Sequence, residues 1–280
     1  MSTSPARRLW AVVEPLHAVV YFAPETASAA KEAGLRGYWM GYFAGRLAPL
    51  GPIGPAPAGS VLFAFAPAMV ARALPDAWSF ASPPDVLRTR LAAVEAALER
   101  VLGPSGHEEL ASLLERAVAA CGFEGRPLAA AWAAVPRPAG ALGRLWLATT
   151  VLREHRGDGH VLAAVHAGLG GLETTLTHIG DGVIGRGDVE PHRGWSDDEW
   201  TAAVDGLRSR GLLGADGRLT SAGAELRRRI EDDTDRLAAA PAEALGPELD
   251  RVLELAVPLA RAVIDAGVVP VPNPMGVARP

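Results

Sequence analysis

The sequence predicts a mainly α-helical protein composed of two winged-helix-like halves. Apolar residues recur with the 3.6-residue period of a helix through most of the chain. Residue patterns typical of a strand or a hairpin occur in only two short segments, residues 61–65 and 212–220. Residues 33–54 also share their order of glycines and apolar residues with residues 167–185. This echo favours a duplicated unit, with short β-hairpin wings and connecting helices.

The composition is that of a folded cytoplasmic protein. Of the 280 residues, 49% are hydrophobic, which is enough for a sizeable core. Cys121 is the only cysteine, so no intrachain disulfide forms, as expected in a reducing compartment. No run approaches the roughly 20 apolar residues that a membrane span needs. The net charge of −5 argues against a broad nucleic-acid surface.

The expected N-terminal half covers residues 1–82 and begins with a helix from Pro5 to Tyr21. Glu14 and His17 lie three residues apart, so they share one face of this helix. A Glu-x-x-His pair is half of a di-iron signature, but the sequence has no second copy. We therefore expect a buried, hydrogen-bonded pair here and no metal.

Residues 37–46 predict a helix with two distinct stripes. Three glycines at four-residue spacing leave one strip bare, which permits close packing of a helix or a ligand. Tyr38, Tyr42 and Arg46 recur at the same spacing, so their polar ends align. Tyr21 is the only other tyrosine. This helix is either a packed edge or one wall of a pocket.

Helix starts are marked by side chains that accept hydrogen bonds from free backbone N–H groups. Ser82, followed by two prolines, precedes a helix expected to end at Leu102. Two capping boxes and a hydroxyl cap mark further starts, at Ser105–Glu108, Ser196–Glu199 and Thr220 or Ser221. Beyond the N-terminal half we expect a helical connector, a C-terminal winged-helix half and a final helix with a proline-rich tail, at residues 83–138, 139–240 and 241–280.

The most polar stretch of the chain is Leu152–His160, with the sequence LREHRGDGH. We expect a helix that ends at the Gly-Asp-Gly turn and a second helix that starts at His160. The free N–H groups of that second helix, together with the two arginines, suit a carboxylate or a phosphate. Glu154 or His155 is a candidate general base, and Asp158 is a candidate helix cap or histidine partner.

Two other interpretations of this stretch stay open. In one, its charges only pin the two helices together by salt bridges. In the other, His155, Asp158 and His160 bind a metal with Glu173 or His178. The spacing matches no zinc signature, so we expect no metal, and the sequence does not identify a cofactor.

Residues 195–236 test the DNA-binding hypothesis through their charge. The order helix, hairpin, helix is that of the second half of a winged helix. These residues hold seven arginines and ten acids, which gives a net charge of −3. The first helix has acids at its N-terminal end and only Arg208 and Arg210 at the other, a poor composition for reading a groove. A DNA-binding regulator is therefore the alternative function.

Four distinctive strings carry a resemblance that covers nearly the whole chain: EPLHAVVYF, GYWMGYFAGRLAPLG, LREHRGDGH and GWSDDEW with the residues after it. By these strings the chain resembles an actinobacterial family of helix-turn-helix proteins. The stretch LRSRGLLGADGRLTSAGAELRRRIEDDTDRLAA is similar to the corresponding part of MarR-type winged helices. The resemblance implies a fold but no particular reaction.

We expect the two halves to enclose a cleft that binds a small anionic or aromatic molecule. Whether the protein also converts this molecule stays open. A nucleic acid is the less favoured partner and belongs to the alternative function, we expect no membrane partner, and we consider a homodimer. The candidate catalytic residues are His155, Glu154, Asp158 and His160, and the candidate ligand-binding residues are Glu14, His17, Tyr21, Tyr38, Tyr42, Arg46, Arg153 and Arg156.

Overall fold

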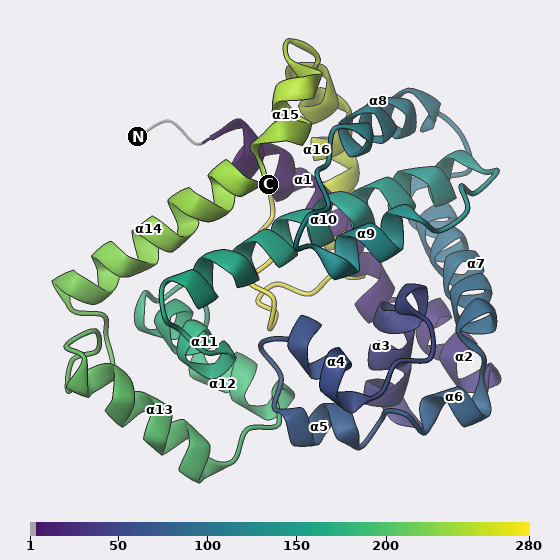
Figure 1. The fold of residues 1–280 in the computed structure, drawn as a ribbon. Coiled ribbons are helices and arrows are strands. Elements are labelled where there is room, and N and C mark those ends of the chain that lie inside the picture. The colour runs from purple at the N-terminus through teal and green to yellow at the C-terminus, as the bar shows by residue number, and fades with distance from the viewer. Residues whose placement is uncertain (1–3) are drawn as a thin grey trace.

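Helices account for nearly all regular structure in this computed structural model, which describes residues 4–280. Figure 1 shows them around one long central helix, α10. The mainly α fold class is thus confirmed. Within the described residues, no helix has both the length and the apolar character needed to cross a membrane.

The elements are α1 (Pro5–Phe22), α2 (Pro24–Glu32), α3 (Gly37–Leu47), η1 (Ala48–Leu50), α4 (Pro55–Val61), α5 (Pro67–Ala71), α6 (Ala77–Phe80), α7 (Pro83–Leu102), α8 (Glu108–Ala119), α9 (Pro127–Ala133), α10 (Ala141–His166), α11 (Gly171–Gly180), α12 (Arg186–Val189), η2 (Glu190–His192), α13 (Asp197–Ser209), α14 (Ser221–Leu237), α15 (Ala239–Leu245) and α16 (Glu248–Asp265).

Helix α10 lies at the centre of the larger of two hydrophobic cores. Helices α1, α7, α8, α9 and α14 pack directly against it. Trp146 of α10 and Trp132 of α9 are buried, and their rings meet edge to face with centroids 5.6 Å apart. Trp146 Nε1 also donates to the His17 carbonyl of α1 at 3.2 Å. These contacts fix the polar residues of α1 and α10 relative to one another.

A smaller core joins α11, α13 and α14, which form the left side of the molecule in Figure 1. Its most buried members are Trp200 and Leu207 of α13 and Ile230 of α14. The apolar stripe of each helix faces the other two, as expected for surface helices. This small core holds α14 beside the last turns of α10.

The turn predicted within Leu152–His160 is wrong, because α10 continues through it to His166. A glycine costs a helix about 1 kcal/mol relative to alanine, so its presence requires another reason. A Cβ at Gly159 would lie 2.7 Å from Arg126 Nη1. Gly159 therefore makes room for this guanidinium, which donates to the backbone carbonyl of His155. The free N–H groups expected at a new helix start do not exist.

The strand predicted at residues 61–65 is also wrong. Helix α4 reaches Val61, and the chain then turns. The polar backbone groups of this turn are satisfied by the C-terminal half of the chain. The Ala66 N–H donates to the Arg193 carbonyl at 2.9 Å, and the Ala64 carbonyl accepts from Trp195 Nε1 at 3.1 Å. The segment thus joins two distant parts of the chain.

The β-hairpin wings predicted for both halves are wrong as well. Residues 4–280 contain no strand, and residues 212–220 form only an isolated antiparallel bridge between Leu213 and Leu219. The Leu219 N–H donates to the Gly180 carbonyl of α11 at 3.1 Å. The ladder does not lengthen into strands, because the Leu212 N–H donates to the Leu207 carbonyl at the end of α13 and Thr220 is already the N-cap of α14.

The echo between residues 33–35 and 167–169 is a shared way of ending a helix. In both copies a glycine with positive φ follows the helix. The N–H of the next residue, Leu35 or Leu169, then donates to the carbonyl five residues earlier at 3.0 Å. This is the Schellman motif. Because the same motif ends three further helices, the echo gives no support to a duplicated unit; those ends are at Gly182, Gly211 and Gly267.

Three of the four predicted helix caps are confirmed. Ser82, Ser196 and Thr220 each accept a hydrogen bond from the first turn of their helix, and Ser196 forms the full capping box. The box predicted at Ser105 is wrong. Helix α8 starts after His107, without a side-chain cap.

Candidate functional site

A cavity of about 790 Å³ lies between α1, α3, α10, α11 and α14. This volume is typical of small-molecule sites. Its walls combine aromatic rings near α3 with charged side chains from α1, α10 and α14. The cavity brings together ten of the twelve sequence-predicted site residues: Glu14, Tyr21, Tyr38, Tyr42, Arg46, Arg153, Glu154, Arg156, Asp158 and His160.

Glu154 is the centre of a buried ion network on the α10 wall. Its side chain is 1% exposed, and its two oxygens accept from Arg46 Nε at 3.0 Å and Arg46 Nη2 at 2.9 Å. Arg153 Nη1 donates to Glu154 at 2.9 Å, while Arg153 Nε donates to Glu14 at 3.3 Å. Burial raises the pKa of Glu154, but Arg153 and Arg46 lower it to about 2. A carboxylate held in this way is a weak base at neutral pH.

His17 lies behind this network in a chain of hydrogen bonds. The Thr150 hydroxyl donates to the Trp146 carbonyl at 2.9 Å, so it accepts from His17 Nδ1, also at 2.9 Å. His17 Nε2 then carries no proton and accepts from the Tyr21 hydroxyl at 3.0 Å. Burial lowers the pKa of His17 well below 6.5, in agreement with a neutral ring. Glu14 and His17 are both buried and hydrogen-bonded, but not to each other.

Three tyrosines, called here the tyrosine wall, are Tyr21, Tyr38 and Tyr42. The ring centroids of Tyr21 and Tyr42 are 5.0 Å apart, and those of Tyr38 and Tyr42 are 6.1 Å apart. The Tyr38 hydroxyl donates to the Tyr21 carbonyl at 3.3 Å, and the Tyr42 hydroxyl accepts from Arg46 Nη1 at 3.2 Å. Helix α3 therefore does form a pocket wall.

A second charged cluster lies toward α14. His160, His178 and Glu231 each place one ligand atom within 4.8 Å of the others. His160 Nδ1 hydrogen-bonds the Thr234 hydroxyl at 3.0 Å, which leaves Nε2 free. A divalent cation bound here would face three guanidinium groups that already pair with Glu231, so the residues fit a metal poorly. Those groups belong to Arg7, Arg156 and Arg227.

His155 does not line the cavity, which corrects the expectation that the whole polar stretch faces one cleft. It is 2% exposed and packs edge to face against Phe123, with ring centroids 6.4 Å apart. Asp158 lies at the cavity's edge, but its Oδ2 accepts from the N–H groups of Leu128 and Ala129, both at 3.0 Å. Asp158 therefore caps α9 and not the helix predicted after it.

Sequence reasoning missed several residues of this cavity. Arg193 lies in a loop without any pattern, and its guanidinium carbon is 4.7 Å from the Phe65 ring centroid. Arg227 had a detectable signal. It follows Gly223 by four residues and precedes Ile230 by three, so it lies on the apolar face of α14. An arginine on such a face requires a buried partner, and here Glu231 supplies it.

Acidification from pH 7 to pH 5 is expected to lower the free energy of unfolding. Burial lowers the pKa of His155 to about 4, that of His160 to about 3, and those of His17 and His178 well below 6.5. In the unfolded chain these histidines become protonated near pH 6.5, whereas in the folded protein they stay neutral to a lower pH. Their contribution to the free energy of unfolding is therefore complete above pH 6.5 and is lost as the pH falls below it. At pH 5 each buried ring lowers the free energy of unfolding by up to about 2 kcal/mol.

Urea unfolding followed by circular dichroism at both pH values measures this change. Asp158 acts in the opposite direction. Burial raises its pKa to about 6, so it takes up a proton in the folded protein between pH 7 and pH 5 and stabilises it, but one carboxyl group does not offset the loss from four histidines. Equal stability at pH 5 and pH 7 would contradict the assignment of neutral buried rings.

A family model described as a helix-turn-helix family matches residues 6–270. No curated protein matches the chain, and neither does any solved structure.

Proposed function

We propose that this chain, which belongs to the helix-turn-helix family whose model it matches, binds a small aromatic anion in the 790 Å³ cavity. The observation that carries the proposal is the pairing of an aromatic end with arginines that have unused donors. Trp39, Tyr42 and Phe65 supply the aromatic end, with neighbouring ring centroids 5.5 to 5.8 Å apart. A planar ligand gains from stacking on such rings.

The arginines of the cavity favour a negative charge on the ligand. Three of them each have one buried nitrogen without a hydrogen-bond partner in residues 4–280: Arg156 Nε, Arg193 Nε and Arg227 Nη1. A buried N–H group left unpaired costs about 1–3 kcal/mol, and more when it is charged. A carboxylate or sulfonate oxygen would satisfy these donors.

Filling the cavity from α10 is expected to abolish ligand binding. Gly157 lines the cavity, and a Cβ there would lie 3.7 Å from Glu154 Oε2, which is an ordinary contact. Gly157→Phe therefore places a ring in the cavity without breaking the helix. We expect 2-naphthoate to quench the fluorescence of Trp10 and Trp39, which line the cavity, and its affinity to fall at least about tenfold in Gly157→Phe.

Gly157→Ala is the matched control, since it adds helix propensity but little volume. We expect this variant to bind 2-naphthoate like the wild type. Unchanged affinity in a folded Gly157→Phe protein would show that the cavity is not the site. Native mass spectrometry of the purified protein adds a second readout, because a retained ligand appears as extra mass.

DNA binding is the second candidate function, and the family description favours it. The exposed N-terminal end of α13 is acidic, with Asp197, Asp198 and Glu199. Its arginines are engaged, since Arg208 Nη2 donates to the Ala215 carbonyl at 3.0 Å and Arg210 Nη1 to the Gly168 carbonyl at 3.1 Å. Fluorescence anisotropy with a duplex from the protein's own promoter tests this function. Binding that weakens steeply with salt would support it.

A further inference from the structure

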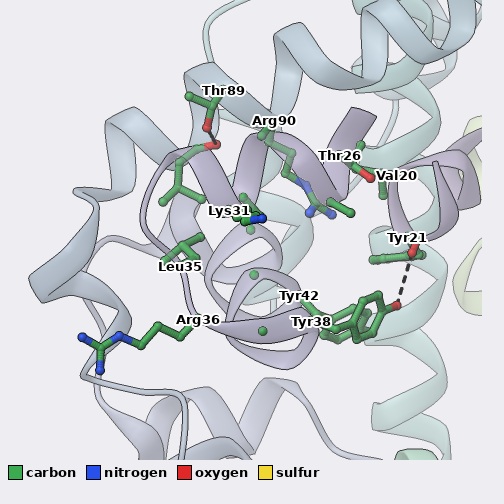
Figure 2. A pocket seen from close by; sticks show the side chains of 17 residues that line it. Val20, Tyr21, Thr26, Lys31, Leu35, Arg36, Tyr38, Tyr42, Thr89 and Arg90 are labelled. Carbon is green, nitrogen blue, oxygen red and sulfur yellow. Dashed lines mark hydrogen bonds between the residues drawn. The ribbon is translucent and has the colours of Figure 1, made fainter. Parts of the chain in front are cut away.

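A second cavity, of about 490 Å³, lies between α2, α3, α7 and the end of α1. Figure 2 shows its side chains around a central space. The tyrosine wall separates it from the larger cavity, because Tyr21, Tyr38 and Tyr42 line both. Nothing in the proposed function uses this space, and the inference below does not depend on that function.

Arg90 of α7 reaches into this cavity, as Figure 2 shows. Its side chain is nine-tenths buried, with 9% of the residue exposed. Its Nε and Nη2 have no hydrogen-bond partner in residues 4–280. The guanidinium lies instead near two rings, 5.7 Å from the Tyr21 centroid and 5.9 Å from the Trp146 centroid. Ring faces attract a cation, but they accept no conventional hydrogen bond.

Other arginines of the chain hydrogen-bond an acid through the two nitrogens that Arg90 leaves unpaired. Elsewhere the same edge of the guanidinium, Nε with Nη2, binds both oxygens of one carboxylate, as in Arg46 with Glu154 and Arg251 with Glu109. Such a two-point contact matches a carboxylate in both shape and charge. The negative charge of Glu154 acts to raise the pKa of Arg90, but the oxygens of Glu154 already accept hydrogen bonds from Arg46 and Arg153. Residues 4–280 therefore supply no hydrogen-bond partner for Nε and Nη2 of Arg90.

The surroundings of Arg90 are built for a guanidinium and lack acids. A Cβ at Gly45 would overlap Arg90 Nη1, so this glycine of the bare α3 strip is what admits the side chain. Among the described residues that line the cavity, Lys31, Arg36 and Arg90 are basic and none is acidic. In a chain of net charge −5, three cations without an acid concentrate positive potential at one place.

Apart from Thr26 and Thr89, whose hydroxyls donate to backbone carbonyls, the rest of the cavity surface is mostly apolar. Val20, Leu35 and Val86 line it together with several alanines and the faces of the tyrosine wall. A bare inorganic anion would leave most of this surface without a partner, whereas an organic acid would cover it. From the unpartnered Arg90 and this apolar lining, we propose that the cavity binds the carboxylate of a small organic acid, with Arg90 as its charge partner and the apolar body of the acid packed against α2 and α3.

Isothermal titration of the full-length protein with 3-phenylpropanoate tests the proposal. We expect saturable binding at millimolar concentration or below, and at least about tenfold weaker binding of the neutral 3-phenylpropanamide. Arg90→Met should reduce the carboxylate affinity at least about tenfold and leave that of the amide unchanged. Arg88→Met, at an exposed arginine of the same helix that does not line the cavity, is the matched control and should change the affinity less than about threefold.

A second pair of variants keeps Arg90 in place. Ala27 is exposed on α2 and lines the cavity. Ala27→Glu brings a negative charge to this cavity and should weaken carboxylate binding about tenfold, while the similarly shaped Ala27→Gln should not. This comparison decides the question if Arg90→Met does not fold.

Several results would overturn the proposal. They are absence of 3-phenylpropanoate binding, equal affinity for the carboxylate and the amide, and full affinity in Arg90→Met or Ala27→Glu. Inorganic phosphate that competes as strongly as 3-phenylpropanoate would also overturn it, because the apolar body of the ligand would then contribute nothing. Because 3-phenylpropanoate is itself an aromatic anion of the kind proposed for the larger cavity, the titrations are repeated in Gly157→Phe, where that cavity is filled. The binding that depends on Arg90 should remain unchanged in this variant, which separates the two sites.

Discussion

Replacing Glu154 by glutamine is expected to lower the free energy of unfolding by about 3–5 kcal/mol, the typical cost of breaking a buried ion pair. Glu154 is the shared acceptor of Arg46 and Arg153. Glutamine keeps the shape but removes the charge. Arg153 is then left with Glu14 as its acid partner, and Arg46 loses the one acid with which it pairs among the described residues. Urea unfolding at pH 7 measures the loss.

Glu109→Gln is the control for this substitution. Glu109 binds Arg251 through the same two-point geometry, at 2.8 and 2.9 Å, but on the surface. Solvent screens that pair, so we expect no measurable loss of stability. If Glu154→Gln is as stable as Glu109→Gln, the buried network is not what holds α3 against α10.

Replacing Gly171 by alanine is expected to destabilise the protein by about 2–3 kcal/mol, in the range of overpacked cores. Gly171 is the first residue of α11, and a Cβ there would overlap the backbone carbonyl of Phe63. Backbone atoms cannot move aside as a flexible side chain can, so α11 must separate from the turn at residues 62–65. That turn lines the 790 Å³ cavity, so the affinity for 2-naphthoate should fall as well.

Gly59→Ala serves as the control for this variant. Gly59 lies within α4, and a Cβ there would have no neighbour within 4 Å. Alanine favours a helix over glycine by about 1 kcal/mol, so this variant should equal or exceed the wild type in stability. Thermal unfolding of both variants compares them directly. A Gly171→Ala protein as stable as Gly59→Ala would mean that the contact with Phe63 is not close in solution.

The sequence alone determined the mainly α fold class and the starts of α7, α13 and α14. The apolar period and the caps at Ser82, Ser196 and Thr220 act within one or two helical turns, so they are local properties of the chain. The sequence also identified ten residues that line the larger cavity, because tyrosines, arginines and acids spaced along single faces of α1, α3 and α10 are costly to bury without partners.

Only the tertiary structure decided what the glycines and the isolated polar residues do. A glycine in LREHRGDGH is compatible with a turn or with a close approach, and the arrival of Arg126 from 33 residues away selects the second. Residues 61–65 have strand-like composition, but the backbone of Ala64 and Ala66 is hydrogen-bonded to Trp195 and Arg193, so no sheet forms. Arg90 carries no motif. Its significance comes from a missing partner, and a missing partner can be recognised only when every neighbour is in place.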